Sequence, residues 1–146
     1  MKISTRVRYG VRLLVELGLH SGDEPVLLRD ISKNQEISEK YLGQIMIPLK
    51  AAGLVRTYRG AHGGYRLGRR AADITLKEIV EVLDGDMCLL DCAREPGSCS
   101  RIVHCVTKSV WQELGKRISS FLESMTLEDL IAQCGDRREV AQMYQI

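Results

Sequence analysis

The most informative stretch of this 146-residue chain is SEKYLGQIMIPLKAAGLVRTYRGAHGGYRL, residues 38–67. Its first part predicts a helix, since Ser38 can cap the start and Gly53 follows the end. Its second part alternates apolar and polar residues over 54–58 and 65–67, with a glycine-rich tip between. We therefore expect a helix followed by a two-stranded β-hairpin. The apolar residues of the helix fall at helical spacing: Leu42, Ile45, Met46 and Leu49.

Two further helices are predicted upstream of this stretch. The first begins after Ser4 or Thr5, either of which can serve as its N-cap. The second is short and stops near Asn34, and a turn at 35–37 separates it from the helix that Ser38 caps. Three helices and a hairpin predict a mainly α fold, a winged helix-turn-helix with a two-stranded β wing. The expected core residues are Val11, Leu14, Ile31, Leu42, Ile45 and Leu49.

Downstream of the hairpin, the sequence predicts three more helices. Thr75-Leu76-Lys77-Glu78 is a capping box, which opens a helix through Leu83. A long amphipathic helix begins at about Val106, and Thr126 caps a last short helix, whereas 135–146 show no strong pattern. The apolar stripe of the long helix consists of Val106, Val110, Leu114, Ile118, Phe121 and Leu122. Because a small winged domain offers few partners for this stripe, we expect a homodimer contact there; packing back on the winged domain is the alternative.

These patterns divide the chain into three regions. We expect a winged helix-turn-helix DNA-binding region at 1–70, a linking helix and cysteine loop at 71–105, and a dimerisation helix with a C-terminal tail at 106–146. The first region carries 13 Lys and Arg against 6 Asp and Glu, whereas the rest of the chain carries 8 against 13. The basic part predicts double-stranded DNA as a partner. The acidic part leaves room for an unidentified protein partner.

Composition narrows the class of protein further. Hydrophobic residues make up 45% and charged residues 27%, which suits a folded soluble domain. No apolar run approaches the roughly 18–20 residues that a membrane span needs, so we expect no membrane contact. Charged residues interrupt the N-terminal segment where a signal peptide would be apolar, and we therefore expect a cytoplasmic protein.

The second helix of a helix-turn-helix enters the major groove with its N-terminal residues. Ser38 and Tyr41 can donate to phosphate, Lys40 can neutralise it, and Gln44 can pair with an adenine edge. At the wing tip, Arg59 can approach the DNA backbone or minor groove, and glycines such as Gly60 permit close approach. For the arginines the alternative is an ordinary solvated surface, and for Tyr41 it is packing.

Five cysteines provide a second candidate site. Cys92, Cys99 and Cys105 are spaced x6 and x5 around a Pro96-Gly97 turn signal, whereas Cys134 stands apart and suits a small buried residue. In a reducing cytoplasm, clustered cysteines hold metal or sense redox state more often than they form disulfides. Three thiolates and one further ligand would suit an iron–sulfur cluster; a zinc staple or a thiol-only redox sensor is the alternative. No second cofactor motif or nucleophile–base arrangement is present, so we expect no enzyme.

Taken together, the chain resembles the Rrf-two family of winged-helix transcription regulators, in particular its iron–sulfur members of the IscR and NsrR type. The resemblance extends from residue 1 to about residue 130. It implies the winged-helix fold, dimerisation and cluster-dependent DNA binding. The motifs that carry it are Met1-Lys2-Ile3-Ser4-Thr5, Arg8-Tyr9, Ile37-Ser38, Tyr41-Leu42, Gly53-Leu54-Val55, Arg59-Gly60, Gly63-Gly64-Tyr65, Thr75-Leu76, Ile79, the three-cysteine loop and Val110-Trp111.

The resemblance also implies site residues. Cys92, Cys99 and Cys105 match the cluster cysteines of the family, with one extra residue in the first spacer. The DNA-contacting positions of the family match Ser38, Tyr41, Gln44 and Arg59. The family's fourth ligand is a histidine or an acidic residue, but the matching positions hold Lys108 and Arg8, so the fourth ligand stays open. Cys88 is one candidate, although its stretch also suits a buried apolar segment; the others are Asp91, Glu95, His104 or a residue of the second protomer. We expect a [2Fe–2S] cluster ahead of a [4Fe–4S] cluster, in a homodimeric regulator whose operator binding the cluster modulates.

Overall fold

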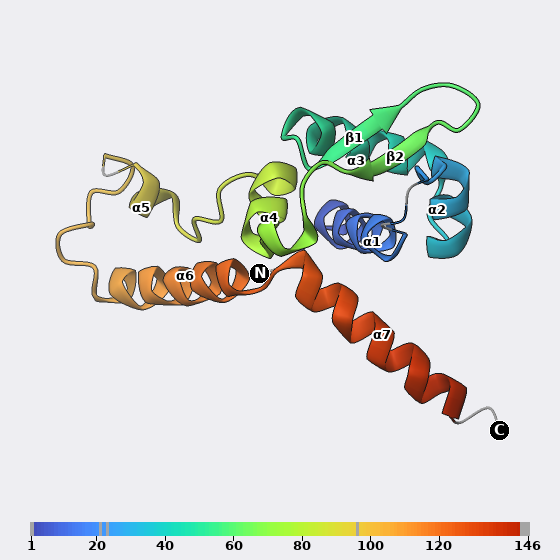
Figure 1. The fold of residues 1–146 in the computed structure, drawn as a ribbon. Helices are drawn as coiled ribbons and strands as arrows, with labels where there is room; N and C mark the ends of the chain where they lie inside the picture. Colours follow the sequence, from blue (N-terminus) through green and yellow to red (C-terminus); the bar gives the residue numbers. More distant parts are fainter. Residues whose placement is uncertain (1, 21, 23, 96, 144–146) are drawn as a thin grey trace.

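The computed structural model describes residues 2–20, 22, 24–95 and 97–143, and the side chains of this range up to residue 136. Met1 of the N-terminal motif, Pro96 of the predicted turn and residues 144–146 of the tail lie outside the described residues. Three helices come first, followed by the hairpin, and four more helices follow after a short 3-10 turn at Ala71–Asp73 (Figure 1). The elements are α1 (Thr5–Leu19), α2 (Leu28–Gln35), α3 (Glu39–Ala51), β1 (Val55–Tyr58), β2 (Gly64–Leu67), α4 (Leu76–Asp84), α5 (Asp91–Arg94), α6 (Val106–Ser124) and α7 (Leu127–Met143).

The predicted helix starts are confirmed by their caps. The Ser4 hydroxyl accepts from the Val7 N–H at 3.0 Å, and the Ser38 hydroxyl accepts from the Tyr41 N–H at 3.3 Å. Thr75 caps α4 in the same way, at 3.2 Å from the Glu78 nitrogen. Each hydroxyl satisfies a backbone donor that the first helical turn leaves without a partner.

The wing is the predicted two-stranded antiparallel sheet, in which Val55 pairs with Leu67 and Tyr58 with Gly64. A backbone bridge between Val26 and Tyr65, at 2.8 and 2.9 Å, ties β2 to the segment before α2. Gly68 follows β2 where a Cβ would lie 2.0 Å from the Gly53 carbonyl oxygen. Only glycine lets the end of the wing lie this close to the end of α3.

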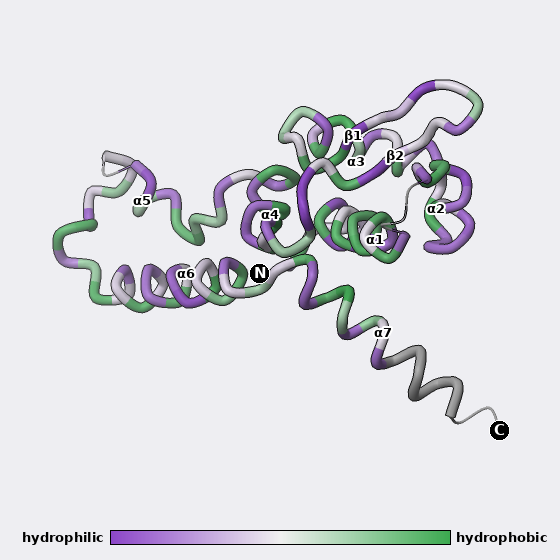
Figure 2. Tube along the Cα trace, viewed as in Figure 1, coloured by the Kyte–Doolittle hydropathy of each residue, from purple (hydrophilic) through white to green (hydrophobic). Residues whose placement is uncertain are grey.

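One core holds the winged body together. The hydrophobic segments of α1, α3 and α4 gather at its centre, whereas α2 is largely hydrophilic (Figure 2). The predicted core is confirmed, except that Val11 is only half-buried. Ile79 of α4 and Leu127 of α7 are fully buried in the same core. The fully buried residues are Leu13, Leu14, Leu17, Ile31, Leu42, Ile45, Met46, Leu49, Leu54, Ile74, Ile79 and Leu127.

The segments before α4 and α7 meet at a second bridge, between Thr75 and Thr126. The Leu76 N–H donates to the Met125 carbonyl at 2.9 Å, and the Leu127 N–H donates to the Ile74 carbonyl at 2.8 Å. After α4, which stays in the core, the chain therefore leaves the winged body and later returns to the place where α4 began. Figure 1 shows this excursion, with α6 on its return path.

Three local expectations are wrong. The cysteine loop contains a short helix, α5, and the last helix is not short, because it continues to Met143. Leu127 and Ile131 pack against the core, and the residues that follow favour helix, so α7 extends without an apolar stripe of its own. Cys134 is half-buried rather than buried, because it lines an open cavity between α7 and α1.

Candidate DNA-binding surface and cysteine loop

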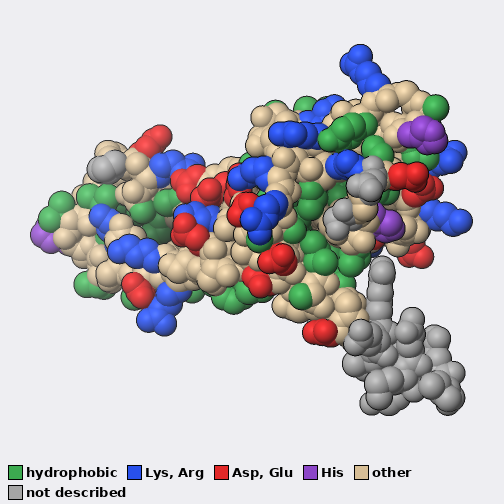
Figure 3. Space-filling model, viewed as in Figure 1, with side chains coloured by type: hydrophobic (Ala, Val, Ile, Leu, Met, Phe, Trp, Pro, Cys, Tyr) green, Lys and Arg blue, Asp and Glu red, His purple; other side chains and the backbone are tan. Residues whose placement is uncertain are grey.

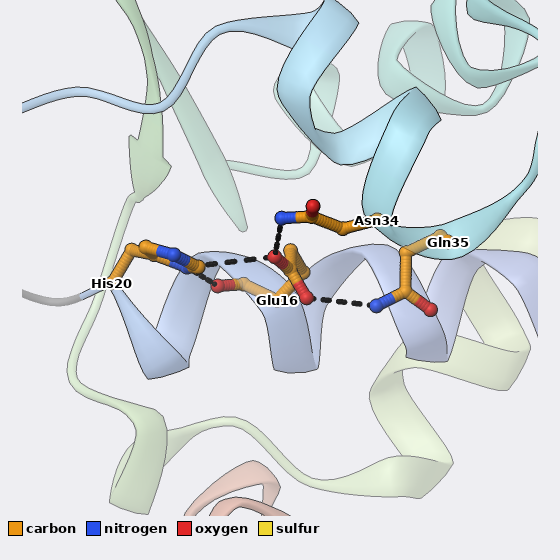
Figure 4. Close-up of polar contacts among 4 residues, drawn as sticks. All are labelled: Glu16, His20, Asn34 and Gln35. Carbon is orange, nitrogen blue, oxygen red and sulfur yellow. Dashed lines mark hydrogen bonds and ion pairs between the residues drawn. The ribbon is translucent and has the colours of Figure 1, made fainter.

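A buried carboxylate fixes the helix-turn-helix. Glu16 of α1 is 2% exposed, and its two oxygens accept from the side-chain amides of Asn34 and Gln35, each at 2.7 Å (Figure 4). His20 lies beside it, with Nδ1 3.6 Å from the carboxylate and 2.9 Å from the Glu16 carbonyl oxygen. Arg12 also donates to both the side chain and the backbone carbonyl of Gln35. The end of α2 is thereby held against α1, immediately before the turn into α3.

The turn itself uses one left-handed residue. Glu36 has φ 55° and ψ 43°, and its backbone N–H bonds to the Ser32 carbonyl to close α2. The Ser32 hydroxyl donates to the Ile37 carbonyl at 2.6 Å. These bonds set the direction in which α3 leaves the turn.

Most of the predicted DNA-contacting residues of α3 are exposed in the structure. Ser38, Lys40 and Gln44 are all solvent-exposed at the N-terminal half of the helix. Tyr41 is half-buried, and its ring packs edge-on against Tyr9 of α1, with centroids 5.9 Å apart and an interplanar angle of 82°. Tyr41 is therefore a packing residue in part, as the alternative interpretation held.

Arginines surround this aromatic pair. The guanidinium carbons of Arg8 and Arg12 lie 5.8 and 5.4 Å from the centroid of the Tyr9 ring. Positive charge is thereby placed beside the N-terminal half of α3. The space-filling view shows Lys and Arg side chains over the winged body and along its outer edge (Figure 3).

At the wing tip, Arg59 and Gly60 are exposed, and Gly60 has φ 103°. Arg66 has a structural role, because it donates to the Gly22 carbonyl at 2.9 Å and lies over the Tyr58 ring at 5.4 Å. Arg59 at the tip and Arg56 on β1 therefore remain the exposed arginines that the wing can present to a partner.

The cysteine loop supplies half-buried free thiols at Cys88, Cys92, Cys99 and Cys105. Cys92 lies in α5, and Cys105 occupies the N-cap position of α6. The pKa of the Cys105 thiol lies below its ordinary value, because the Thr107 hydroxyl, 3.3 Å away, and the Lys108 N–H bond to its sulfur. The Cys88 thiol donates to the Leu90 carbonyl at 3.1 Å.

These donors suit an iron–sulfur cluster by their chemistry, since thiolates are its usual ligands. The positions of the thiols in this structure, however, do not form a cluster site. Among the residues that the structure describes, no three His, Cys, Asp or Glu side chains come together where they could hold a metal ion. A cluster held by Cys92, Cys99 and Cys105 therefore requires the loop to close around it.

Two residues with a place at these sites escaped the sequence analysis. Glu16 is a single acidic residue at a core position of the stretch Leu13-Leu14-Val15-Glu16-Leu17, and that contrast is a readable signal of a buried polar contact. Ile47 is 67% exposed on α3. Ile47 follows Ile45 and Met46 directly and therefore falls outside the helical spacing of the core residues. This position in the sequence indicates an apolar side chain on the outer face of α3.

No helix in the described part of the chain has the length and apolar character needed to cross a membrane.

Comparison with known proteins gives consistent results. Residues 3–133 match the family described as Rrf2, iron-dependent transcriptional regulator. The chain is 37% identical over 131 residues to protein rrf2 of Nitratidesulfovibrio vulgaris, a match that covers 90% of this chain and 87% of the relative.

Solved structures with the same fold include regulators named IscR and CymR. CymR, the global cysteine regulator of B. subtilis, is 34% identical with a TM-score of 0.79, covering 91% of this chain and 98% of CymR. IscR of T. potens is 39% identical with a TM-score of 0.77, covering 92% and 88%. The oxidized form of Staphylococcus aureus CymR is 33% identical with a TM-score of 0.71, covering 90% and 96%.

Proposed function

This chain belongs to the Rrf2 family of transcriptional regulators, and we propose that it is a homodimer whose operator binding responds to an iron–sulfur cluster held by Cys92, Cys99 and Cys105. As a member of that family it is a DNA-binding regulator with a winged-helix fold, and not an enzyme. The observation that carries the DNA-binding part is the exposed N-terminal half of α3 beside a basic wing. We place its work in the cytoplasm, where the DNA of a bacterial regulator lies.

The DNA contacts divide by chemistry. Ser38 and Lys40 contact phosphate, and Gln44 pairs with an adenine edge in the major groove. Tyr41 contributes its hydroxyl while its ring stays packed on Tyr9. Arg59 and Gly60 carry the wing tip to the backbone or the minor groove.

The second copy of the chain covers α6. No residue of α6 is fully buried, and although Leu114, Ile118 and Leu122 are half-buried, its other large apolar side chains remain largely in solvent. The exposed fractions are 85% for Val106, 60% for Val110, 45% for Trp111 and 61% for Phe121. Exposed apolar surface of this extent marks a protein contact, and two-fold pairing of winged domains matches two-fold DNA half-sites.

Sedimentation at micromolar concentration tests this contact. We expect a dimer for the wild type and a monomer for Val110→Glu, whereas Ser120→Glu, an exposed polar position on the same helix, stays dimeric. A monomeric wild type contradicts the dimer.

Support for the cluster is the donor set of the loop, together with the similarity to an IscR structure and to a family described as iron-dependent. Cys88, four residues before Cys92, is one fourth-ligand candidate, and we expect [2Fe–2S] ahead of [4Fe–4S]. The residues that binding would order are those between α4 and α6. Because α4 packs on α1 and α3, a change there can reach the DNA-binding surface.

A thiol-based or zinc-stapled loop is the second candidate. It is favoured by the similarity to CymR, of which an oxidized form is known, and by the separate positions of the free thiols in this structure. In this case oxidation of the cysteines, rather than loss of a cluster, changes DNA binding.

One experiment separates the candidates. The chain is purified without oxygen, and its visible spectrum and its iron, sulfide and zinc contents are measured. Operator binding is then compared before and after removal of the metal and after oxidation, on a duplex selected from a random library. Visible absorption with iron and sulfide supports the cluster, whereas a colourless protein that responds to oxidant supports the thiol candidate. Binding to no duplex above the level of random DNA contradicts the regulator.

A further inference from the structure

Ile47 is an apolar side chain on the outer surface of α3. It is 67% exposed, whereas Leu42, Ile45, Met46 and Leu49 of the same helix are at most 2% exposed. It lies three residues after Gln44 and seven after Lys40, so the three side chains share one helical face. Ser38, which caps the helix, lies at the N-terminal end of α3, just before Lys40.

Neither packing nor helix propensity accounts for isoleucine at this position. The side chain is not among the residues that pack against the core. A β-branched residue is also less favourable in a helix than alanine or a long polar side chain. An isoleucine in solvent therefore gains nothing in the free chain, which points to a partner.

Gly43, one turn earlier, adds a second observation on the same face. A Cβ at this position would meet nothing within 4 Å, so no packing contact requires glycine there. Glycine inside a helix is less favourable than alanine. Side chains of a helix lean toward its N-terminus, and the missing side chain at position 43 leaves the Ile47 methyl groups accessible from that side.

We propose that Ile47 is a specificity-determining residue that contacts the C5-methyl group of a thymine in the major groove of the operator. The inference rests on the proposed function, because it takes α3 to be the helix in the groove. The thymine methyl is the apolar feature that base pairs present in this groove, and aliphatic side chains recognise it. Hydrogen-bonding groups of the same face, Lys40 and Gln44, contact phosphate and an adenine edge.

The helix geometry places this thymine. Three residues of helix advance about 4.5 Å along the axis, and successive base pairs are about 3.4 Å apart. The thymine therefore lies one or two base pairs from the base that Gln44 contacts. Polar readout by Gln44 and apolar readout by Ile47 thus specify neighbouring positions of a half-site.

Replacement of single thymines by uracil tests the contact with the methyl group. A duplex is selected from a random library with the full chain, and each thymine is then replaced singly by deoxyuridine, which lacks only the methyl group. Fluorescence anisotropy gives the affinity of each duplex. We expect one thymine per half-site whose replacement weakens wild-type binding about fourfold, the loss that corresponds to about 0.8 kcal/mol for one buried methyl-sized group. Ile47→Ala should lose this affinity on the thymine duplex and lose nothing further on the uracil duplex.

Two variants serve as controls. Lys40→Ala should weaken binding to both duplexes by the same factor, because a phosphate contact does not sense the methyl group. Ile47→Thr keeps a β-branched methyl and should retain part of the discrimination. Since Ile47 is exposed, urea unfolding of both Ile47 variants should match the wild type.

If Ile47→Ala discriminates thymine from uracil as the wild type does, the inference is wrong while the regulator stands. The same holds if the coupled thymine lies more than two base pairs from the position that Gln44→Ala relaxes. If selection enriches no duplex, the proposed function itself fails.

Discussion

The Glu16 carboxylate of α1 accepts a 2.7 Å hydrogen bond from the Asn34 side chain at the end of α2. α2 is largely polar, and Ile31 is the only fully buried residue in this described helix, while Ile37 of the turn that follows is also buried. The position of α3 relative to the core therefore depends on a polar contact as well as on apolar packing. This relationship links a residue in the core to the surface that contacts DNA.

We predict that Glu16→Ala lowers the free energy of unfolding by about 2–3 kcal/mol. The substitution removes the buried carboxylate that accepts from the partly exposed amides of Asn34 and Gln35, and a hydrogen bond to a charged group contributes about 1.5–3 kcal/mol. Urea unfolding measures the change. Glu24→Ala removes an exposed carboxylate and should stay within about 0.5 kcal/mol of wild type. Equal stability of the two variants would show that the buried contact contributes little.

Substitutions of Gln44 and Lys40 should change DNA binding in different ways. Gln44→Ala should relax sequence preference at one base pair, by about 1–3 kcal/mol for a bidentate contact. Lys40→Ala should weaken binding to all sequences alike, because it removes a phosphate contact. Affinities for selected and random duplexes decide the matter. Equal losses on both duplexes for Gln44→Ala would remove it from the base-contacting residues.

DNA binding should depend steeply on salt. Residues 1–70 hold 13 of the 21 Lys and Arg residues of the chain, and binding by two such regions releases counterions from phosphate. For roughly 6–10 phosphates neutralised, affinity should fall by about 10³–10⁵ between 50 and 200 mM salt. Anisotropy titrations over this range give the slope, and a flat response would contradict binding through the basic surface.

Each loop cysteine should be required for the cluster. Replacement of Cys92, Cys99 or Cys105 by Ser removes one of three thiolates, and anaerobically purified protein should lose its visible absorption, iron and sulfide. Cys134→Ala, a half-buried cysteine outside the loop, is the matched control and should keep them. Loss of colour in Cys88→Ala would identify the fourth ligand. A triple variant that binds iron and sulfide like wild type contradicts the cluster assignment and leaves the DNA-binding surface untouched.

The attachment of the wing should tolerate no side chain at Gly68. A Cβ there would lie 2.0 Å from the Gly53 carbonyl oxygen, and backbone atoms cannot move aside as a flexible side chain can. Gly68→Ala should therefore lower the free energy of unfolding by more than about 1 kcal/mol. Gly43→Ala, with nothing within 4 Å, should instead raise it by about 0.5–1 kcal/mol. Thermal unfolding compares the two, and the same sign for both would contradict the geometry at Gly68.

The predictable parts of the structure are those fixed by local chemistry. Ser4, Ser38 and Thr75 cap their helices because a hydroxyl at that position bonds a backbone N–H three residues away, whatever the rest of the chain does. The core of α3 was equally accessible, since helical spacing alone brings Leu42, Ile45 and Leu49 to one face. The wing was predictable from its alternation and its glycines.

The parts that escaped prediction depend on contacts between distant segments. Glu16 stands out as a lone acidic residue among apolar ones, but its partners Asn34 and Gln35 lie 18 and 19 residues later in the chain, and no local pattern identifies them. The length of α7 depends on Leu127 entering a core formed by the first half of the protein. Spacing identified the loop cysteines as candidates but could not place their sulfurs, because an irregular loop has no fixed periodicity.

Residues 76–125 form a segment whose ends meet at the bridge between Thr75 and Thr126; α4, at its start, stays in the core of the winged body, and the rest is a cassette outside that core. The two ends of the segment are hydrogen-bonded to each other, so lengthening or exchanging the middle would cost little closure entropy and would leave the DNA-binding face undisturbed. The same arrangement prevents the cassette from pulling on the body through its ends. A structural change in the cysteine loop can therefore reach the DNA-binding surface only through the contacts of α4 with α1 and α3. In such an arrangement the segment between α4 and α7 can be exchanged for another while the helices that contact DNA keep their sequence.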